Sequence, residues 1–365
     1  MAGRMAGCFF FQASFSRLRI FGKITEEQRS SRKQMRTPSF HRWALLLHGG
    51  TYAVQPNTTD RKLEAEYRQA LGTALQAGAA LLNEGASAVD AVEKTIVSME
   101  DNPLFNAGRG AVFTCEGTIE LDASIMDGAN LKAGAVACVS QARYPIRLAR
   151  AIMEHSPHVM LFGPGADAFG RTQNLEQAGL EYFFTERRWK ALVEYLTKLG
   201  KPVPVRPPRV GGSPAELPLS DQIEPHGTVG AVALDKDGNL AAGTSTGGTV
   251  GKWPGRVGDT AVIGAGTYAS NNSCAVSATG AGEYFIRLAV ARTICALMEY
   301  RGMALQDAVD EVIQRQLPIL QKSSGGVIAV NRDGKMAWSF NTPGMLRARQ
   351  TEGEEPLVCV FNGDK

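Results

Sequence analysis

Two turn signatures commit much of this chain to antiparallel sheet. Each is a polar turn with an Asp-Gly pair between two apolar runs: 235–239 between 228–234 and 240–246, and 331–334 between 326–330 and 335–340. An Asp-Gly turn flanked by such runs is the strongest short-range signal of a β-hairpin. We therefore predict that Thr228 begins one pair of antiparallel strands and that a second pair lies near the C-terminus.

Helices and further strands are predicted by the spacing of apolar residues. Helical spacing covers 63–83, 88–99 after a serine N-cap, 145–154, 282–300 and 305–316. Strand-like runs lie at 43–48, 111–114, 118–126 and 131–139. Each half of the chain thus combines antiparallel strands with paired helices, so we predict sheets packed on each other with helices outside. The Pro- and Gly-rich residues 198–225 are predicted to be an exposed flexible linker.

Composition is typical of a globular enzyme and excludes several other classes of protein. The 365 residues are 44% hydrophobic and 21% charged, and 40 glycines indicate many tight turns. The net charge of +3 is misleading, because residues 1–42 hold nine Lys and Arg against two Glu, which leaves the rest mildly acidic. No basic stripe with interleaved aromatic residues is present, so we expect no nucleic-acid partner. No apolar run reaches the ~18 residues of a membrane span, so we expect no membrane association.

The first 41 residues are set apart as an N-terminal extension, either disordered or the product of a mis-assigned start. They are rich in Arg and Ser and have no acidic residue before Glu26, which is typical of an organellar transit peptide. Met35 is also well placed for a start codon ahead of the first strand. Both interpretations stay open, and we expect a cytoplasmic protein unless this segment directs it to an organelle.

Patterns that suggest other chemistries are weak. The six cysteines include no Cys-x-x-Cys pair and are predicted to be reduced, mostly buried thiols. The one close histidine pair, His155 and His158, encloses a proline, which disfavours a zinc site. The run Gly264-Ala-Gly266 is followed by a turn and not by a helix, which excludes a dinucleotide-binding loop. The run Thr279-Gly-Ala-Gly-Glu283 does open a helix, whose N-terminus favours a carboxylate or an oxyanion.

The segment His226-Gly-Thr-Val-Gly230 is a candidate site of self-cleavage. A threonine hydroxyl is a weak nucleophile, but a threonine that is residue one of a chain has its own α-amine as a base. Cleavage between Gly227 and Thr228 would create this arrangement directly after the predicted linker. Taken alone, such a pentapeptide more often marks a loop glycine ahead of a strand.

Seven sequence blocks in a fixed order favour the self-cleavage interpretation over an ordinary loop glycine. They are His48-Gly-Gly50, 103–108, 121–128, 226–230, Thr244-Ser-Thr-Gly-Gly248, 255–259 and 278–282. Over about residues 43–350 the chain resembles the plant-type L-asparaginase / isoaspartyl peptidase (β-aspartyl-peptidase) family of N-terminal-nucleophile (Ntn) hydrolases. The resemblance implies an α+β fold, a four-layer αββα sandwich of two stacked, mainly antiparallel sheets flanked by helices. It also implies an α subunit, 42–227, and a β subunit, 228–365, which form one domain and assemble as two processed pairs, (αβ)2.

The family's functional residues fall on matching positions of this sequence. The resemblance makes Thr228 the nucleophile after cleavage at Gly227, with Thr246 beside it and Asn106 supporting the processing step. It implies an oxyanion hole of Thr279 and Gly280 and further substrate contacts from Arg256, Val257, Gly258, Asp259, Ala281 and Gly282. Arg256 would hold the substrate α-carboxylate and Asp259 its α-ammonium group, which selects a free aspartyl head.

The chemistry requires no cofactor, but the resemblance implies a structural sodium ion. Its ligands would be backbone carbonyl groups of Met99, Glu100, Asn102, Phe105, Ala107 and Arg109. Asn102 and Arg109 differ from the small or apolar residues common in that loop. Thr51-Tyr52 and Gly251 also depart from the family pattern, which leaves the rate and the substrate preference open.

Three functions are weighed. The first is an autoprocessing threonine amidohydrolase that hydrolyses small molecules, namely β-aspartyl dipeptides and L-asparagine, and releases L-aspartate through an acyl-enzyme on Thr228. The second is a glycosylasparaginase, a branch that usually has Asp before the nucleophile and disulfide bonds, neither of which this sequence indicates. The third is an unprocessed, inactive binding protein, which would require the loss of a key residue. We expect the first.

Overall fold

The computed structural model describes residues 42–52, 61–207, 227–322 and 324–361. The predicted N-terminal extension and residues 208–225 of the predicted linker lie outside the described residues. In the described part of that linker, Lys198 is still the last residue of a helix, and 199–207 form no regular structure. No helix in the described ranges is both long and apolar enough to cross a lipid bilayer.

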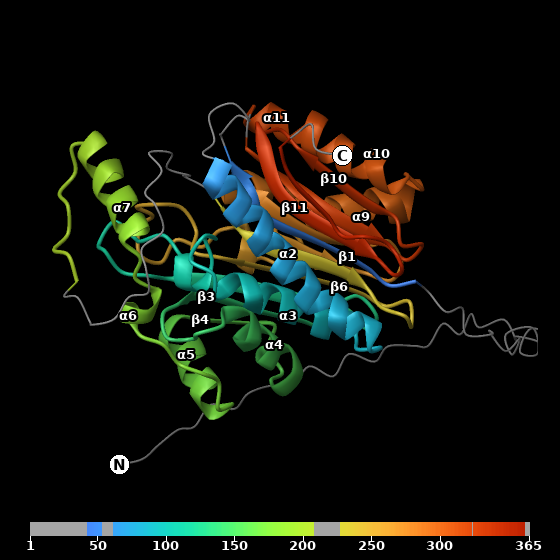
Figure 1. Cartoon of the computed structure of the whole chain (residues 1–365), viewed down its shortest axis with the longest axis horizontal. Coiled ribbons are helices and arrows are strands. Elements are labelled where there is room, and N and C mark those ends of the chain that lie inside the picture. Colours follow the sequence, from blue (N-terminus) through green and yellow to red (C-terminus); the bar gives the residue numbers. More distant parts are fainter. Residues whose placement is uncertain (1–41, 53–60, 208–226, 323, 362–365) are drawn as a thin grey trace, which may run out of the picture. The chain divides into compact units, whose positions relative to one another are not determined.

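The larger sheet takes strands from both halves of the chain (Figure 1). In spatial order its strands are β12 (Leu357–Phe361), β11 (Gly344–Thr351), β1 (Ala44–Tyr52), β5 (Val229–Leu234), β6 (Leu240–Thr246), β2 (Leu121–Asp127), β3 (Ala133–Val139) and β4 (Met160–Phe162). Neighbouring strands are antiparallel except β3 and β4. The predicted hairpin of β5 and β6 is confirmed, and its Gly238 has a φ of +79°, a value that favours glycine. Thr228 therefore directly precedes a central strand.

The smaller sheet contains the second predicted hairpin. Its strands, in order, are β10 (Met336–Phe340), β9 (Gly325–Asn331), β8 (Cys274–Gly280) and β7 (Thr267–Ala269), all antiparallel. The two sheets face each other across a buried layer that includes Leu46, Val232 and Ile328. The two hairpins thus belong to different sheets that share one core.

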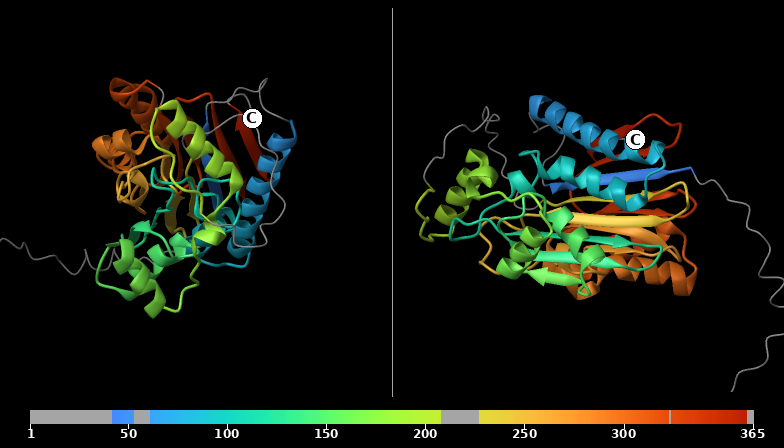
Figure 2. Two further views of the ribbon diagram at one scale, coloured as in Figure 1. Left: turned by 90° about the vertical axis from the view of Figure 1, so that its left-hand side faces the viewer. Right: turned by 90° about the horizontal axis from the view of Figure 1, so that it is seen from below.

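Helices cover the outer face of each sheet, so the fold has four layers (Figures 1 and 2). The large sheet is covered by α2 (Arg61–Asn83), α3 (Ala88–Glu100) and α4 (Pro145–His155). The small sheet is covered by α8 (Gly282–Leu288), α9 (Val290–Arg301), α10 (Leu305–Asp310) and α11 (Leu317–Leu320). The αββα sandwich expected from the resemblance is confirmed.

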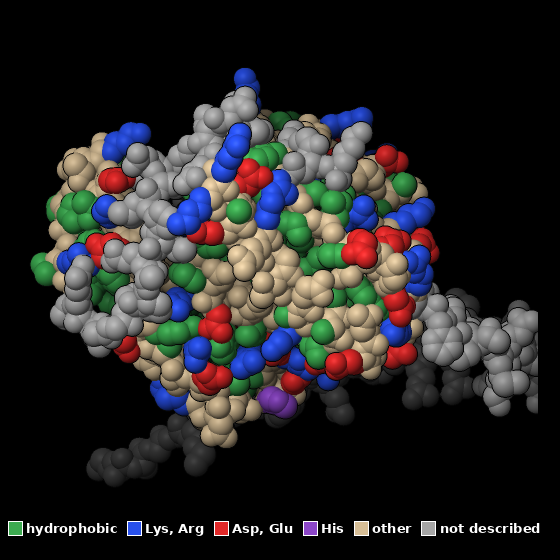
Figure 3. Space-filling view, in the orientation of Figure 1, with side chains coloured by type: hydrophobic (Ala, Val, Ile, Leu, Met, Phe, Trp, Pro, Cys, Tyr) green, Lys and Arg blue, Asp and Glu red, His purple; other side chains and the backbone are tan. Residues whose placement is uncertain are grey.

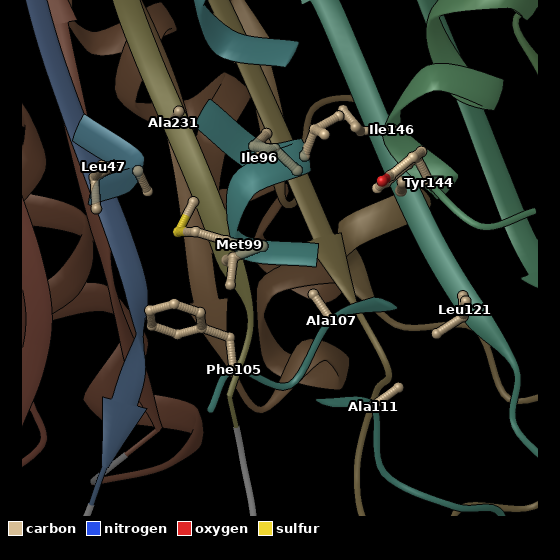
Figure 4. Close-up of a cluster of buried hydrophobic side chains, with 14 of the residues drawn as sticks. Leu47, Ile96, Met99, Phe105, Ala107, Ala111, Leu121, Tyr144, Ile146 and Ala231 are labelled. Carbon is tan, nitrogen blue, oxygen red and sulfur yellow. The ribbon is translucent and has the colours of Figure 1, made fainter. Parts of the chain in front are cut away.

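Alternation of side chains along the strands separates two hydrophobic cores. On β1, Leu45 and Leu47 face the core under α2 and α3, whereas Ala44 and Leu46 face the small sheet. Figure 4 shows the helix-side core, where Met99 at the end of α3 lies among side chains of the sheet. Burying a leucine or a methionine stabilises a fold by about 1.5–3 kcal/mol. The alternation therefore fixes which face of β1 each residue occupies.

The prediction of one helix over 282–300 is wrong. The chain forms two helices, α8 and α9, with Ala289 between them in the left-handed conformation at φ 46°. The backbone N–H of Arg292 donates to the carbonyl oxygen of Gly264 at 2.8 Å instead of to the preceding helical turn. A hydrogen bond to a distant loop interrupts the helix, and local apolar spacing cannot reveal such a bond.

Other differences also follow from weak local signals. Residues 111–114 form no strand, although Thr114 bridges to Lys252, and Glu311–Gln316 have π-helical hydrogen bonding in place of the predicted α-helix. Strands β4, β7, β8, β11 and β12 were not predicted, and neither were the helices α5 (Gly163–Thr172), α6 (Leu180–Phe183), α7 (Glu186–Lys198) and α11. Strand β11, for example, contains Arg347 and Arg349, which obscure its hydrophobic alternation.

The surface agrees with the mixed charge of the sequence. On the face shown in Figure 3, acidic and basic side chains of the described part are interspersed. Cys115, Cys138, Cys274 and Cys295 are free thiols, and the last two are buried. No group of three potential metal-ligating side chains occurs in the part of the chain that the structure describes.

Candidate active site

Segments far apart in the sequence surround the peptide bond between Gly227 and Thr228. The Gly227 carbonyl oxygen accepts hydrogen bonds from Asn106 Nδ2 at 2.8 Å and from Thr246 Oγ1 at 3.0 Å. Gly50 lies against the same bond, because a β-carbon added to it would be 3.0 Å from the Gly227 Cα. Thr228 is buried, with an exposed fraction of 6%. The predicted scissile carbonyl thus has two hydrogen-bond donors.

The Thr246 hydroxyl connects the predicted nucleophile to that carbonyl. Pairing of β5 with β6 sets Val229 opposite Ser245, which brings Thr246 beside Thr228. The Thr228 hydroxyl donates to Thr246 Oγ1 at 3.1 Å, and the Thr246 hydroxyl donates onward to the Gly227 oxygen. A proton can therefore pass from the attacking oxygen to the oxygen that becomes negative.

Asn106 is oriented by its own surroundings. Its Oδ1 accepts from the backbone N–H of Val112 at 3.0 Å, which fixes the amide with Nδ2 toward Gly227. The other Nδ2 hydrogen bonds to the Gly248 oxygen at 2.7 Å. Asn106 follows the end of α3 in the loop predicted to bind sodium. Both donors of this side chain are consequently committed to the segments around Thr228.

Thr279 and Gly280 end β8 of the small sheet, and Thr279 contacts β1 next to Gly50. Thr279 is fully buried, and its Oγ1 accepts from the backbone N–H of Thr51, the neighbour of Gly50, at 3.4 Å. Gly280 has a φ of +150°, and a β-carbon on it would lie 2.1 Å from the Ser324 oxygen. Only glycine fits this position. Strand β1 is thus the common neighbour of the scissile bond and the predicted oxyanion hole.

Arg256 lies among glycines next to the Thr228 site. A β-carbon on Gly258, Gly282 or Gly248 would lie 2.7, 3.2 or 3.4 Å from its terminal nitrogens. The absence of side chains at these three positions leaves room for the guanidinium group, and the Arg256 side chain is 16% exposed. Gly248 also accepts the hydrogen bond from Asn106, so the same loop contacts both the predicted anion site and the scissile segment.

Glu283 is a partner of Arg256 that the sequence analysis missed. Its Oε1 accepts from Arg256 Nε and Nη2 at 3.0 and 2.9 Å. Its position in the first turn of α8 was visible in the sequence, but nothing in the sequence indicated which cation it meets. The contact holds the guanidinium group in one orientation.

The remaining predicted contacts are placed as follows. Val257 is 37% exposed beside Arg256, and the Gly258 N–H lies 3.5 Å from Asp122 Oδ2. The backbone N–H of Ala281 donates to the Ser324 oxygen at 2.7 Å. That N–H is therefore already bonded within the protein, in contrast to a free donor of an oxyanion hole.

Asp259 is a buried carboxyl group close to Arg256. Gly282 separates the two, because its β-carbon position is 2.7 Å from Asp259 Oδ1 and 3.2 Å from Arg256 Nη2. Asp259 Oδ2 is buried without a hydrogen-bond partner. Burial raises the pKa of Asp259 to about 7, and the positive charge of Arg256 opposes this rise. An unpartnered buried carboxylate is suited to bind a cation such as an ammonium group.

Replacing Asp259 by asparagine is expected to stabilise the folded protein at pH 8. Because folding raises the pKa of Asp259 from its ordinary value near 4, the free energy of unfolding is highest below about pH 4, falls up to about pH 7 and is level above. Asp259→Asn removes this dependence and should add about 2 kcal/mol at pH 8. Denaturant unfolding of both proteins at pH 4 to 8 measures it. Identical pH profiles would refute the raised pKa.

The predicted sodium loop has carbonyl groups gathered around two glycines. A β-carbon on Gly108 would lie 2.4 Å from the Glu100 oxygen, and one on Gly110 would lie 2.0 Å from the Phe105 oxygen. Backbone N–H groups already donate to the oxygens of Met99, Asn102 and Ala107. Burial raises the pKa of the Glu100 side chain to about 8, and its Oε2 has no partner. The close approach of the Glu100 and Phe105 oxygens requires residues without side chains at 108 and 110.

Two departures from the family pattern now have a structural setting. Thr51 is buried, and its N–H bonds to Thr279 as described above. Gly251 has a φ of +66°, and a β-carbon on it would lie 2.6 Å from the ring of Tyr195 in α7. The tyrosine ring therefore occupies the space beside residue 251 where a larger residue would extend.

Known proteins resemble this chain over nearly its whole described length. The family model described as asparaginase matches residues 41–360, a range that includes every predicted site residue. The isoaspartyl peptidase of Escherichia coli (strain K12) is 46% identical over 317 residues, covering 87% of this chain and 95% of its own. The isoaspartyl peptidase/L-asparaginase of Mus musculus is 40% identical over 319 residues, covering 87% and 88%. That of Xenopus laevis is 39% identical over 320 residues, covering 88% and 96%.

Proposed function

The chain belongs to the asparaginase family, and on that basis we propose that it cleaves itself between Gly227 and Thr228 and then hydrolyses isoaspartyl dipeptides and L-asparagine. It is an Ntn hydrolase, and L-aspartate is its product. The observation that carries the proposal is the Thr246 hydroxyl, which bonds both to the Thr228 hydroxyl and to the Gly227 carbonyl.

In the processing step, Thr228 Oγ1 attacks the carbonyl carbon of Gly227. The Thr228 proton passes to Thr246 Oγ1, and the proton of Thr246 passes to the Gly227 oxygen. Asn106 Nδ2 stabilises the negative charge that develops on that oxygen before the proton reaches it, an effect typically worth about 3–4 kcal/mol for one donor. The C–N bond then breaks as the nitrogen takes the proton from the oxygen, and water hydrolyses the resulting ester.

In the catalytic cycle, the new α-amine of Thr228 takes the proton of its own hydroxyl. Thr228 Oγ1 attacks the side-chain carbonyl of the aspartyl substrate, and the oxyanion forms at Thr279 and Gly280. The α-ammonium group of Thr228 returns the proton to the leaving ammonia or amino acid. Water then hydrolyses the acyl-enzyme and L-aspartate leaves. Arg256 and Asp259 hold the substrate's α-carboxylate and α-ammonium groups throughout.

The assay that tests the proposal compares three substrates. β-Aspartyl-leucine and L-asparagine should both be hydrolysed to L-aspartate, measured by a coupled assay, whereas an N-glycosylated asparagine should not. Preference for the glycosylated substrate would transfer the chain to the glycosylasparaginase function. No turnover of any of the three by fully cleaved protein would reject a hydrolase of aspartyl amides.

Arg256→Lys is expected to raise KM for β-aspartyl-leucine about 10- to 100-fold with a smaller effect on kcat. Lysine keeps the positive charge but cannot form two parallel hydrogen bonds to a carboxylate, a difference of about 1.5–3 kcal/mol. Steady-state kinetics give both constants. Arg287→Lys is the matched control, because no substrate contact is assigned to Arg287. Its guanidinium group lies over the ring of Tyr284 on α8, 6.0 Å from the ring centroid. An unchanged KM for Arg256→Lys would remove Arg256 from the substrate site.

Two further features complete the proposal. A sodium ion would bind the backbone carbonyls of the 99–109 loop and hold Asn106 in position, which the approach of the Glu100 and Phe105 oxygens to Gly108 and Gly110 supports. The processed α and β chains, divided after residue 227, would assemble as (αβ)2. Light scattering after size-exclusion chromatography measures the assembled mass.

A further inference from the structure

A continuous chain of buried polar side chains crosses the layer between the two sheets. It consists of His48 (β1), Ser277 (β8), Thr244 (β6), Thr267 (β7) and Ser124 (β2), each with an exposed fraction of 0%. The successive contacts are His48 Nε2–Ser277 Oγ at 3.0 Å, Ser277–Thr244 at 2.7 Å, Thr244–Thr267 at 2.5 Å and Thr267–Ser124 at 2.8 Å. We call these five residues the polar chain.

The two ends of the polar chain contact the two parts of the proposed active site. At one end, His48 Nδ1 lies 3.1 Å from the carbonyl oxygen of Thr228. At the other end, Ser124 Oγ donates to the carbonyl oxygen of Thr260 at 2.6 Å, in the turn that contains Asp259. The polar chain therefore connects the nucleophile to the residue proposed to bind the substrate's ammonium group.

The sequence makes room for the polar chain at Gly230. A β-carbon at this position would lie 2.0 Å from Ser277 Oγ and 2.5 Å from His48 Nε2. Any residue larger than glycine would displace the contact between these two side chains. Gly230 is therefore required because a side chain at this position would break the hydrogen bond between His48 and Ser277.

Counting protons fixes the direction of the hydrogen bonds at both ends. Both terminal groups are carbonyl oxygens, which can only accept, so His48 donates from Nδ1 and Ser124 donates to Thr260. Burial lowers the pKa of His48 to about 3, so its Nε2 carries no proton and accepts from Ser277. The Ser124 hydroxyl also donates to Thr267 Oγ1 at 2.8 Å, so it has two acceptors for its one proton.

Thr244 is the link between the two ends. Its hydroxyl has two acceptors, Ser277 Oγ at 2.7 Å and the Gly266 carbonyl oxygen at 3.3 Å, and Thr267 Oγ1 lies 2.5 Å away. Without the Thr244 hydroxyl, Ser277 still donates to His48, and Ser124 still donates to Thr267 and Thr260, but no hydrogen bond joins these two groups. Replacing Thr244 by valine, which has nearly the same shape, would therefore divide the polar chain into two unconnected halves.

We propose that the polar chain is a positioning network that couples the orientation of Thr228 to the turn carrying Asp259, with Thr244 as its link. The inference rests on the proposed function. Cleavage would separate Thr228 from Gly227. The positions of its α-amine and hydroxyl would then depend on the hydrogen bonds made by the rest of the residue. A bond from His48 to the Thr228 carbonyl restricts that residue without touching the reacting atoms.

A double-mutant cycle on the full-length, processed protein tests the coupling. Ser124→Ala should lower kcat for β-aspartyl-leucine about three- to tenfold as well as raise KM, although Ser124 contacts neither Thr228 nor Thr246. In a Thr244→Val background, Ser124→Ala should change KM alone. Thr95→Val is the matched control, because the Thr95 hydroxyl is buried in α3 without a partner and lies outside the polar chain.

The outcomes separate the coupling from simple damage to the fold. Thermal unfolding of each variant shows whether it is folded, and effects of Ser124→Ala on kcat that are the same with and without Thr244→Val would overturn the proposal. Nitrogen-15 NMR of the labelled histidines should show His48 as one neutral tautomer with its proton on Nδ1. A proton on Nε2 would contradict the stated direction of the bonds.

These measurements also distinguish the inference from the proposed function. If the wild-type protein hydrolysed no aspartyl substrate, the proposed function would fail. The rate of cleavage at Gly227 would then replace kcat in the same cycle. Additive effects on cleavage would overturn the coupling, and non-additive effects of about threefold or more would support it.

Discussion

Thr228→Ala should yield a single uncut chain with no measurable hydrolase activity. The Thr228 hydroxyl is the attacking group in both proposed steps, and removal of a catalytic nucleophile typically lowers kcat on the order of 10⁶-fold. A denaturing gel shows the cleavage, and N-terminal sequencing of the smaller wild-type band should begin at Thr228. The fold should be unaffected, because alanine leaves only a small space at a residue that directly precedes a strand.

Thr228→Ser is the matched variant for this experiment. Serine keeps the hydroxyl that contacts Thr246 and should retain cleavage and activity at reduced rates. Cleavage of Thr228→Ala at the same position would exclude Thr228 as the processing nucleophile and would point to a separate protease. An uncut wild-type chain would favour the inactive binding protein that the sequence analysis weighed.

Asn106→Asp should slow self-cleavage about 10²- to 10³-fold. Aspartate keeps the Oδ1 that accepts from Val112 but lacks the two N–H donors to Gly227 and Gly248. It also brings negative charge to the carbonyl oxygen that becomes an oxyanion. The conversion of precursor to cleaved product after cell-free synthesis, followed over time on a gel, gives the rate.

A control in the same loop separates this effect from loss of structure. Asn102 Oδ1 accepts from the backbone N–H of Leu104, and its side chain makes no hydrogen bond to the scissile segment. Asn102→Asp keeps that acceptor and should cleave at close to the wild-type rate. Equal rates for Asn106→Asp and the wild type would show that Thr246 alone stabilises the oxyanion.

The fold was predictable from sequence where local signals determine it. The Asp-Gly turns fixed two antiparallel pairs, and Ser87, which was expected to cap a helix, does so through a capping box with Asp90. The break at Ala289 depends on a bond to Gly264, and β11 pairs with β1 about 300 residues away in the chain. No local pattern contains such long-range pairings, so sequence reasoning missed them.

The candidate site was predictable to the extent that the family resemblance named its residues. The roles of Thr228, Asn106 and Arg256 remain predictions, although the structure brings the first two into contact at one peptide bond. Glu283 and the polar chain could not be anticipated, because their members are ordinary hydroxyl and carboxyl residues until the sheets stack. Spatial convergence of common residue types leaves no trace in a single sequence.

The strand order of the large sheet has a consequence for the life of the processed molecule. Strands β5 and β6, which follow Gly227, lie between β1 and β2, which precede it. If the chain is cleaved as proposed, the two pieces remain interleaved, and neither can separate without breaking the ladders on both sides of this hairpin. Exchange of one piece between molecules would then require the large sheet to come apart, so each α piece would remain with the β piece with which it was synthesised.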